Sequence, residues 1–382
     1  MAEVAIVRCE SYEQREVDAA VHRGLELIGG LRSFVKPGEK ILLKPNMLSA
    51  DPPEKCVTTH PAVFKAAALA LQKAGVQLSY GDSPGFGSPE GVARKSGIAA
   101  VAAELGIPLA DFHQGQEAVC AQALQNKKFT IAQGVLASEG LISLPKLKTH
   151  GLTRMTGCIK NQFGCIPGFL KGEYHVKLPE VSHFAQMLVD LNVLLQPRLF
   201  IMDGIIAMEG NGPRGGRPKK MNVLLFSSDP VALDAVVCRM VGVIPETVST
   251  IQAGMKSGLG TCLEQDINLL GDVLEAFADS TFDINRGSNH NQRRIPQSKL
   301  LREILLSKPC IIESGCVKCG VCIKVCPVIP KVLAWPQGDQ ERPPVYDYDR
   351  CIRCFCCQEL CPESTIIIKK TRLRRWVDKI HA

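Results

Sequence analysis

The sequence predicts an α/β protein with a largely parallel sheet and flanking helices, followed by a small α+β domain at the C-terminal end. Up to residue 282, short apolar runs rich in β-branched residues alternate with segments in which apolar residues have helical spacing. After Cys310 the chain changes to closely spaced cysteines, prolines and short apolar runs. These observations divide the 382 residues into an α/β domain at 1–282, a polar and basic linker at 283–309, and a second domain at 310–382.

The elements of the larger domain follow from local patterns. Short apolar runs predict strands at residues 4–7, 40–43, 76–80, 140–144, 199–202 and 223–226. Helical spacing predicts helices at residues 17–27, 61–74, 182–195 and 230–240. Pro61 suits the first turn of a helix, and Gly75 suits the position that follows a last turn. Strands that alternate with helices in this way are typical of a parallel sheet covered by helices.

The composition is that of a globular protein. Hydrophobic residues make up 46% and charged residues 22% of the chain, which excludes a disordered or fibrous protein. No run approaches the roughly 20 apolar residues that span a bilayer. The N-terminus also lacks the basic segment and following apolar segment of a secretory signal. We therefore expect a cytoplasmic protein without a membrane span, and the net charge of +7 is too mild to indicate nucleic-acid binding.

Cysteine is the unusual residue. The chain has 17 cysteines, and they crowd into its C-terminal part. In a reducing compartment, clustered thiols bind metal more often than they form disulfides. Two runs share the spacing C-x2-C-x2-C-x3-C and are each followed by proline: Cys316, Cys319, Cys322 and Cys326, and then Cys351, Cys354, Cys357 and Cys361. This is the spacing of proteins that hold two [4Fe–4S] clusters.

The fourth cysteine of each run is displaced and precedes a proline that turns the chain, so we expect it to bind the cluster of the other run. One cluster is predicted to take Cys316, Cys319, Cys322 and Cys361, and the other Cys351, Cys354, Cys357 and Cys326. The alternative is a pair of structural zinc sites, which typically use paired C-x2-C units separated by a longer loop. Cys356 fits neither run and is interpreted as a free thiol beside a cluster.

This part of the chain resembles a bacterial two-cluster ferredoxin. The resemblance implies two similar halves related by a pseudo-twofold axis. It also implies clusters that carry single electrons, and hence a redox partner protein. The basic residues at 369–379 either balance the negative charge of the clusters or form a docking surface for an acidic partner.

In the larger domain, four polar loops follow predicted strands. They contain Lys44-Pro45-Asn46, Gly81-Asp82-Ser83, the segment from Lys146 to Asn161, and Asp203-Gly204. Ligands of open α/β sheets bind at the carboxyl ends of strands, so we expect Lys44, Asp82, His150, Lys160 and Asp203 to line one cleft. The candidate catalytic residues are His150, Lys146, Lys160, Asp82 and Asp203. The candidates for binding an anionic small molecule are Lys44, Asn46 and Lys148.

Each of these residues also has a structural alternative. Asp82 and Asp203 can cap the turn or helix that follows a strand, and Lys44 and Lys146 can be solvated strand ends. His150 is the preferred candidate for general acid–base chemistry, because neighbouring lysines would lower its pKa and keep the ring neutral. The glycine-rich motifs of dinucleotide- and nucleotide-binding proteins are absent from the sequence.

The same loops resemble the domain-of-unknown-function 362 (DUF362) family. The matching motifs are Lys44-Pro45-Asn46, Thr59-His60-Pro61, Gly81-Asp82-Ser83, Lys146–His150, Lys160-Asn161, Asp203 through Gly212-Pro213, and Asp229 through Asp234. The resemblance covers roughly residues 36–245. It implies an α/β domain that is often fused to a two-cluster ferredoxin module, but it implies no reaction.

Three functions remain open from the sequence. The first is an iron–sulfur oxidoreductase component whose clusters exchange electrons with a site on the α/β domain. The second is a non-catalytic electron carrier or scaffold, and the third is a ligase- or transferase-like enzyme with structural clusters. Convergent lysines would favour an enzyme with an anionic ligand, and a cluster packed close to them would favour the first function.

Overall fold

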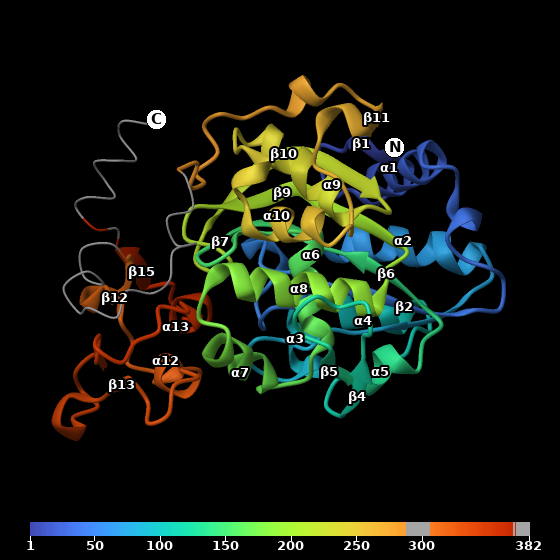
Figure 1. The fold of residues 1–382 in the computed structure, drawn as a ribbon. Coiled ribbons are helices and arrows are strands. Elements are labelled where there is room, and N and C mark those ends of the chain that lie inside the picture. Colours follow the sequence, from blue (N-terminus) through green and yellow to red (C-terminus); the bar gives the residue numbers. More distant parts are fainter. Residues whose placement is uncertain (288–305, 370, 372–382) are drawn as a thin grey trace.

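The computed structural model describes residues 1–287, 306–369 and 371, which form an α/β domain with a smaller domain against one end (Figure 1). The predicted linker residues 288–305 and the tail residues 370 and 372–382 lie outside the described residues. A nine-stranded sheet forms the centre of the larger domain. Its strands are β1 (Ala2–Arg8), β2 (Lys40–Pro45), β3 (Gln77–Tyr80), β6 (Gly140–Leu144), β7 (Lys146–His150), β8 (Arg154–Thr156), β9 (Leu199–Glu209), β10 (Arg217–Ser227) and β11 (Ile267–Gly271).

The strand pairing confirms the predicted α/β fold with a largely parallel sheet. The main path runs β11-β1-β10-β9-β6-β2-β3, and β7 and β8 branch from β9. The pairs of β1 with β11, β2 with β3, β2 with β6, β6 with β9, and β7 with β9 are parallel. β10 is antiparallel to both of its neighbours, because it follows β9 directly in a hairpin, and β8 is antiparallel to β7 for the same reason.

Helices cover both faces of the sheet, as Figure 1 shows. One face packs against α1 (Gln14–Leu27), α2 (Pro61–Lys73), α3 (Pro89–Lys95) and α4 (Ile98–Glu104). The other packs against α6 (Cys158–Asn161), α8 (Val181–Leu195), α9 (Pro230–Met240) and α10 (Ser249–Lys256). The shorter elements of this domain are α5 (Gln133–Leu136), α7 (Leu170–Lys177), and the hairpin of β4 (Gly115–Val119) with β5 (Lys128–Ala132).

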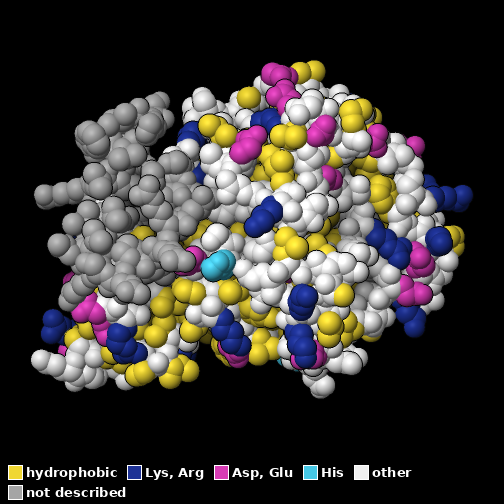
Figure 2. Space-filling model, in the orientation of Figure 1, with side chains coloured by type: hydrophobic (Ala, Val, Ile, Leu, Met, Phe, Trp, Pro, Cys, Tyr) yellow, Lys and Arg dark blue, Asp and Glu magenta, His cyan; other side chains and the backbone are white. Residues whose placement is uncertain are grey.

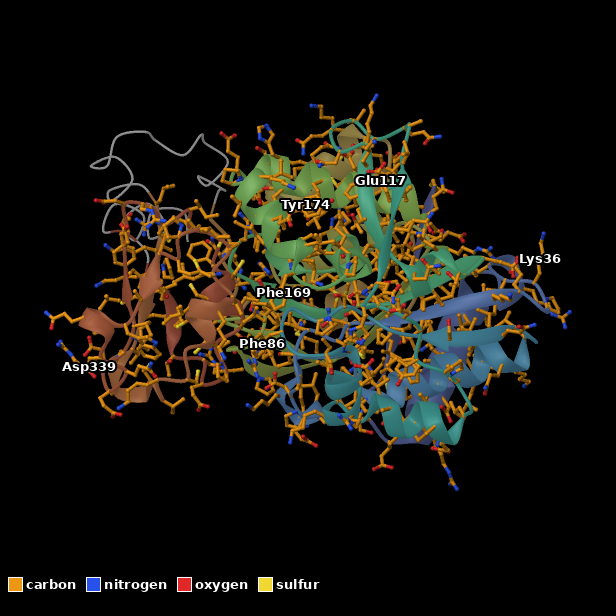
Figure 3. All side chains as sticks on the ribbon, turned by 90° about the horizontal axis from the view of Figure 1, so that it is seen from below. Lys36, Phe86, Glu117, Phe169, Tyr174 and Asp339 are labelled. Carbon is orange, nitrogen blue, oxygen red and sulfur yellow. The ribbon has the colours of Figure 1, made fainter. Side chains whose placement is uncertain are left out.

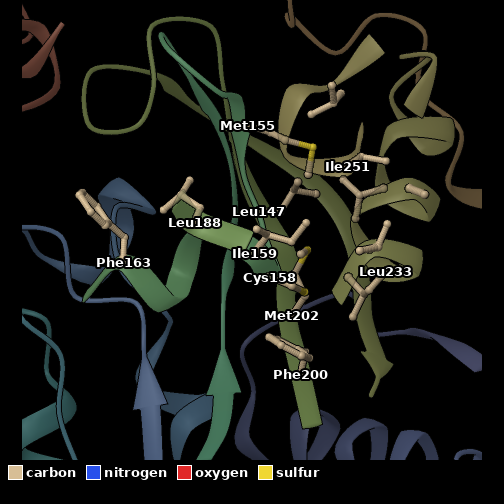
Figure 4. Close-up of a cluster of buried hydrophobic side chains, with 14 of the residues drawn as sticks. Leu147, Met155, Cys158, Ile159, Phe163, Leu188, Phe200, Met202, Leu233 and Ile251 are labelled. Carbon is tan, nitrogen blue, oxygen red and sulfur yellow. The ribbon is translucent and has the colours of Figure 1, made fainter. Parts of the chain in front are cut away.

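Two hydrophobic cores result, one on each side of the sheet. Along β9, Leu199 and Ile201 join the core beneath α1 and α2, whereas Phe200 and Met202 join the opposite core. This alternation follows from the two-residue period of a strand. Figure 4 shows the second core, where Phe200 and Met202 lie near Leu233 of α9.

Two predicted loops are strands in the structure, which is a correction to the sequence analysis. Residues 146–150 form β7, and β9 does not end at Met202 but continues through Asp203 to Glu209. Both segments can extend because the sheet supplies partners for them: β7 pairs with β9 and β8, and β9 pairs along its length with β10. Polar side chains predicted at strand ends are therefore held within the sheet.

The C-terminal domain is small and contains short elements. Strand β12 (Lys308–Ile311) pairs antiparallel with β15 (Ile366–Lys369), and β13 (Leu333–Ala334) pairs with β14 (Val345–Tyr346). Helices α12 (Val321–Lys324) and α13 (Cys356–Glu359) each contain a cysteine of one predicted cluster run. Of the helices in the described ranges, none has both the length and the apolar character needed to cross a bilayer.

Candidate functional site

The C-terminal domain docks on the α/β domain through the end of α13. Gln358 Nε2 donates hydrogen bonds to the side-chain and backbone oxygens of Asn211, at 2.9 and 3.0 Å. Asn211 Nδ2 donates to the Ile366 carbonyl at 3.0 Å, and the Arg214 guanidinium donates to the Leu360 carbonyl at 3.0 Å. The contacts run in both directions between the domains, so α13 has a fixed place against the loop that joins β9 to β10.

Glu359, the last residue of α13, enters the α/β domain as a nearly buried carboxylate. Its Oε2 lies 3.5 Å from His150 Nε2, and its Oε1 lies 4.0 Å from Lys160 Nζ. Burial opposes ionisation, but Lys160 and His150 together hold the pKa of Glu359 well below its usual range. A charged carboxylate of the cysteine-rich domain thus contacts two predicted site residues of the α/β domain.

His150 is held as a neutral imidazole. Burial, followed by the charge of Lys160, lowers its pKa to about 4. Its Nδ1 accepts hydrogen bonds from the backbone N–H groups of Leu152 and Thr153, at 3.0 and 3.3 Å. We therefore assign the ring proton to Nε2, which faces Glu359. The pKa shift has the direction expected from the sequence, but its main causes are burial and Lys160 rather than the lysines beside His150 in the chain.

Lys44 and Asp82 form a buried ion pair at the ends of β2 and β3. Lys44 Nζ lies 2.8 Å from Asp82 Oδ1, and the lysine side chain is fully buried. The backbone N–H of Met47 donates to Asp82 Oδ2 at 2.7 Å. Gly164 packs directly on this pair, because a Cβ at that position would lie 1.7 Å from Asp82 Oδ1. Lys44 is therefore a support for Asp82 rather than a solvated strand end.

Changing Gly164 to Ala is expected to lower the free energy of unfolding by about 1–3 kcal/mol, because the added methyl group must displace the Lys44–Asp82 pair. Urea unfolding followed by circular dichroism measures the effect. Gly172→Ala is the matched control: its Cβ would meet only Pro327, at an ordinary 3.5 Å, within helix α7. That change should leave the free energy of unfolding unaltered or raise it by up to about 1 kcal/mol. Equal losses in the two variants would contradict the prediction.

Lys146 and Asp203 form a second buried ion pair. Lys146 Nζ donates to Asp203 Oδ2 at 2.8 Å and to the Tyr12 hydroxyl at 2.7 Å. The Tyr12 hydroxyl donates to Asp203 Oδ1 at 2.8 Å, and the backbone N–H of His60 donates to Asp203 Oδ2 at 2.9 Å. The ring of His60 stacks on Tyr12 with 3.6 Å between centroids. Asp203 thus has its hydrogen-bonding capacity occupied by residues from three parts of the chain.

Lys148 and Asn46, both predicted to bind an anion, contact each other. Lys148 Nζ donates to Asn46 Oδ1 at 2.9 Å and to the Val57 carbonyl at 2.6 Å. Asn46 Nδ2 donates to Asn161 Oδ1 at 3.1 Å. Burial, followed by repulsion from Lys160, lowers the pKa of Lys148 to about 7. A lysine without a carboxylate partner is therefore close to losing its charge in this position.

A cavity of about 110 Å³ lies between the two domains, and we call it the interdomain cavity. Of the predicted site residues, it is lined by Asn46, Asp82 and Lys160. The C-terminal domain contributes Cys356 and Glu359 to the wall. The cavity thus brings one free thiol, two carboxylates and two lysines, Lys160 and Lys171, together at the carboxyl ends of β2 and β3.

The expectation of a single cleft is wrong for the other predicted residues. Lys44 lies beneath Asp82, and Asp203 and Lys146 are enclosed within the sheet because β9 continues past Asp203. His150 lines a separate cavity of about 380 Å³, which none of Asn46, Asp82 and Lys160 lines. Of the five residues expected to line one cleft, Asp82 and Lys160 share the interdomain cavity, which Asn46 also lines, whereas Lys44, His150 and Asp203 do not line it.

Sequence reasoning missed Lys171 and Ser83 as a pair, and it missed Glu359. Lys171 Nζ donates to Ser83 Oγ and, at 2.9 Å, to the Ile166 carbonyl. Burial lowers the pKa of Lys171 to about 7, with Asp82 opposing the shift and Lys44 adding to it. Ser83 stood in a selected loop, but no local pattern marked Lys171 as its partner.

The cysteines of the C-terminal domain surround two small cavities. One is lined by Cys316, Cys319, Cys322 and Cys361. The other is lined by Cys326, Cys351, Cys354 and Cys357. Each cavity takes three cysteines from one run and the fourth from the other, which is the grouping that the spacing predicts. Cys356 lines neither cavity and instead faces the interdomain cavity.

The donor sets fit iron–sulfur clusters. Four thiols line each cavity, with Ile311 and Ile366 as apolar neighbours in the first and Val332 in the second. Within the described ranges, no three His, Cys, Asp or Glu side chains are placed to hold a single metal ion. The ligands of a four-iron cubane are held farther apart, because each thiolate binds a different iron. The Tyr346 hydroxyl donates to Cys357 Sγ at 3.4 Å, a contact of the kind that tunes cluster potentials.

Comparison with known proteins gives matches for both domains. Residues 308–362 match a 4Fe-4S dicluster domain, and residues 41–239 match a domain of unknown function, DUF362. A thylakoid-associated protein of Synechocystis sp. is 37% identical over 257 residues, which cover 67% of this chain and 79% of that protein. An uncharacterized ferredoxin of Methanocaldococcus jannaschii is 33% identical over 60 residues, which cover 16% of this chain and 75% of that protein.

A solved structure has a distant likeness to the larger domain. It is the lactate racemase apoprotein from Thermoanaerobacterium thermosaccharolyticum, with a TM-score of 0.41 and 12% sequence identity. The match covers 61% of this chain and 55% of the racemase. The family matches carry more weight: the C-terminal domain is a dicluster domain for two [4Fe–4S] clusters, and the DUF362 match includes more than half of the chain. The chain therefore belongs to the DUF362 family, with an iron–sulfur ferredoxin-type domain fused after the family domain.

Proposed function

We propose that the protein is an iron–sulfur oxidoreductase component in which the two-cluster domain exchanges electrons with a small anionic ligand in the interdomain cavity. One observation carries the proposal. The cavity that Asp82 and Lys160 line is also lined by Cys356 and Glu359 of α13, a helix that lies within the second cluster run. A tethered carrier or scaffold would not need this contact. The hydrogen bonds of Gln358 and Arg214 across the domain boundary also favour an integrated enzyme over those rivals.

The charges around the interdomain cavity support an anionic ligand. Lys160 and Lys171 line the cavity, and Lys44 and Lys148 contact residues of its wall, whereas the carboxylates of the wall are Asp82 and Glu359. Buried charge is costly unless it is paired. The two lysines without a carboxylate partner are the two whose pKa is lowered to about 7. An anion in the cavity would supply the missing negative charge.

The roles of the individual residues follow from their contacts. We assign Lys160, Asp82 and Asn46 to contact with the ligand, and His150 to the positioning of Glu359. Lys44 orients Asp82, Lys148 orients Asn46, and Lys146 with Asp203 holds β7 to β9. The eight cysteines around the two small cavities are the proposed cluster ligands, in the crossed grouping. The clusters, when bound, supply single electrons at the cavity wall.

We propose that a redox partner protein meets the cluster nearer the surface. Cys319 is the exposed member of the eight proposed ligands, whereas Cys357 is buried on α13. An electron would thus enter near Cys319 and leave near the interdomain cavity. A cytoplasmic location is the simplest for free clustered thiols, and the thylakoid-associated relative makes a membrane surface the alternative.

Redox titration of the anaerobic protein, followed by electron paramagnetic resonance, tests the proposal. Acetate or inorganic phosphate is expected to make the potential of one cluster more negative, because a bound anion opposes the addition of an electron. Lys160→Met should abolish this shift. Lys128→Met is the control, since Lys128 is an exposed lysine paired with Glu117 outside the cavity. If neither anion changes the potential of either cluster in the unmodified protein, the proposal that electrons are exchanged with a ligand in this cavity is wrong.

A further inference from the structure

We propose that the interdomain cavity binds a small organic carboxylate, with its carboxylate group on Lys171 and Ser83 and its apolar part against Phe163 and Leu360. The inference rests on the proposed function, and it adds the chemical class of the ligand. It also assigns a binding role to Lys171 and Ser83, neither of which the sequence analysis predicted to bind a ligand. The contacts of Lys171, the hydroxyl of Ser83 and the apolar wall each support a part of it.

Lys171 is a cavity-lining cation with neutral partners. Its Nζ donates to Ser83 Oγ and to the Ile166 carbonyl, and among the described residues no carboxylate lies within 4.0 Å of it. The other lysine of the cavity wall, Lys160, faces Glu359. An incoming anion would therefore find its strongest unmatched positive charge at Lys171.

Ser83 supplies a second donor at the same place. Its Oγ accepts from the backbone N–H of Gly168 at 2.9 Å and from Lys171 Nζ, so its own O–H is left to donate. The backbone N–H of Ser83 is bonded to the Gly164 carbonyl, which fixes the turn after Asp82. A hydroxyl and an ammonium group that touch each other present two donors to the two oxygens of one carboxylate.

The wall also has an apolar part, which would favour an organic acid over an inorganic anion. Phe163 and Leu48 from the α/β domain face Val325 and Leu360 from the C-terminal domain. Phe169 stands at the mouth with 79% of its surface exposed, and Figure 3 places it at the boundary of the two domains. Figure 2 shows hydrophobic side chains on the surface over α7 and α12, around this boundary. Burying an apolar group of the ligand here would stabilise the complex.

The volume sets the size of the ligand. A bound water needs about 10–15 Å³ of such space, so a cavity of about 110 Å³ has room for roughly seven to eleven waters. A monocarboxylate with a short chain or a small ring fits this space. A nucleotide or a sugar phosphate does not.

Binding should depend on pH through Lys171. The groups that face it are Asp82, Lys44, Cys165 and Glu359, with Lys160 and His175 elsewhere on the cavity wall. Because the pKa of Lys171 is lowered to about 7, the side chain loses its charge as pH rises above that value. A carboxylate binds the charged form, so its affinity should be highest below pH 7. It should then fall by up to about tenfold per pH unit above pH 7.

Isothermal titration calorimetry of the cluster-loaded protein with butanoate, acetate and inorganic phosphate tests the proposal. Butanoate is expected to bind at least tenfold more tightly than the other two at pH 6.5. Lys171→Met should weaken butanoate binding at least tenfold, and Lys177→Met on the exposed side of the same helix should not. Lys171→Arg should retain binding but lose the pH dependence between pH 7 and 8.5, because arginine stays charged. Iron content reports that each variant has folded.

Each contrary result has its own meaning. If phosphate binds at least as tightly as butanoate, the ligand is not an organic carboxylate, although the anion site of the proposed function survives. If butanoate binds equally to Lys171→Met and Lys177→Met, Lys171 is not the binding residue, and the proposed function again survives. If none of the three probes binds the unmodified protein, both proposals fail.

Discussion

Replacing Cys319 with serine is expected to lower the iron content of the anaerobically purified protein from about eight irons per chain to about four or fewer. Cys319 lies with three other cysteines around one small cavity, and a cubane that loses a thiolate ligand is held by only three. Iron and acid-labile sulfide assays, with electron paramagnetic resonance of the reduced protein, measure the loss. This is the largest effect that we expect from a single substitution.

The control is Cys356→Ser, which should keep all of the iron. Cys356 is the neighbour of a proposed ligand, Cys357, but it lines the interdomain cavity instead of either cysteine cavity. The two variants therefore separate a ligand from a nearby thiol in the same domain. Zinc in place of iron, or the same loss of iron from both variants, would refute the assignment of ligands.

The second large effect concerns stability. Changing Asp203 to Ala is expected to reduce the free energy of unfolding by about 3–5 kcal/mol, because it leaves the ammonium group of Lys146 buried without a counter-charge. The side chains of both residues are almost completely buried, so water cannot replace the carboxylate. Urea unfolding followed by circular dichroism measures the change in the α/β domain.

Two comparisons identify the cause of that loss. Glu117→Ala breaks an exposed pair with Lys128 and should cost no more than about 1 kcal/mol. Replacing both partners, in Asp203→Leu with Lys146→Met, should recover much of the stability that Asp203→Ala loses, because no unpaired charge remains. If the double variant is as unstable as the single one, packing rather than charge explains the effect.

Local sequence patterns were sufficient to predict the main strands and helices of the α/β domain. The β-branched run at residues 4–7 lies within β1, and the helix predicted at 230–240 is α9 with the same bounds. Gly75 follows α2 with a φ of +84°, as its predicted place after the last turn requires. These features depend on residues close together in the chain, which is why periodicity and capping residues reveal them.

The site itself depends on contacts between distant residues. The sequence marks Asp82 and Lys160 as polar residues after strands, but only the folded chain shows that Glu359 of the other domain contacts Lys160 and lines the same cavity as Asp82. Glu359 lies between two cysteines of a cluster motif. The motif predicts only the cluster ligands, so the spacing of the cysteines gives no role to the residues between them. Asp203 was misplaced because the length of β9 is fixed by its partner β10, which no local pattern reports.

The position of Gln358, Glu359 and Leu360 has a consequence for how the protein is made and how it is damaged. These residues stand between two cysteines, Cys357 and Cys361, that belong to different cavities, and they also form the seam between the domains. If the proposed function is correct, iron loading during maturation would thus complete the proposed ligand pocket as well as the proposed electron path. We expect iron-free protein to bind no carboxylate, and brief exposure to air to abolish ligand binding together with the cluster signal. Damage to the clusters by oxygen would then remove electron transfer and ligand binding together.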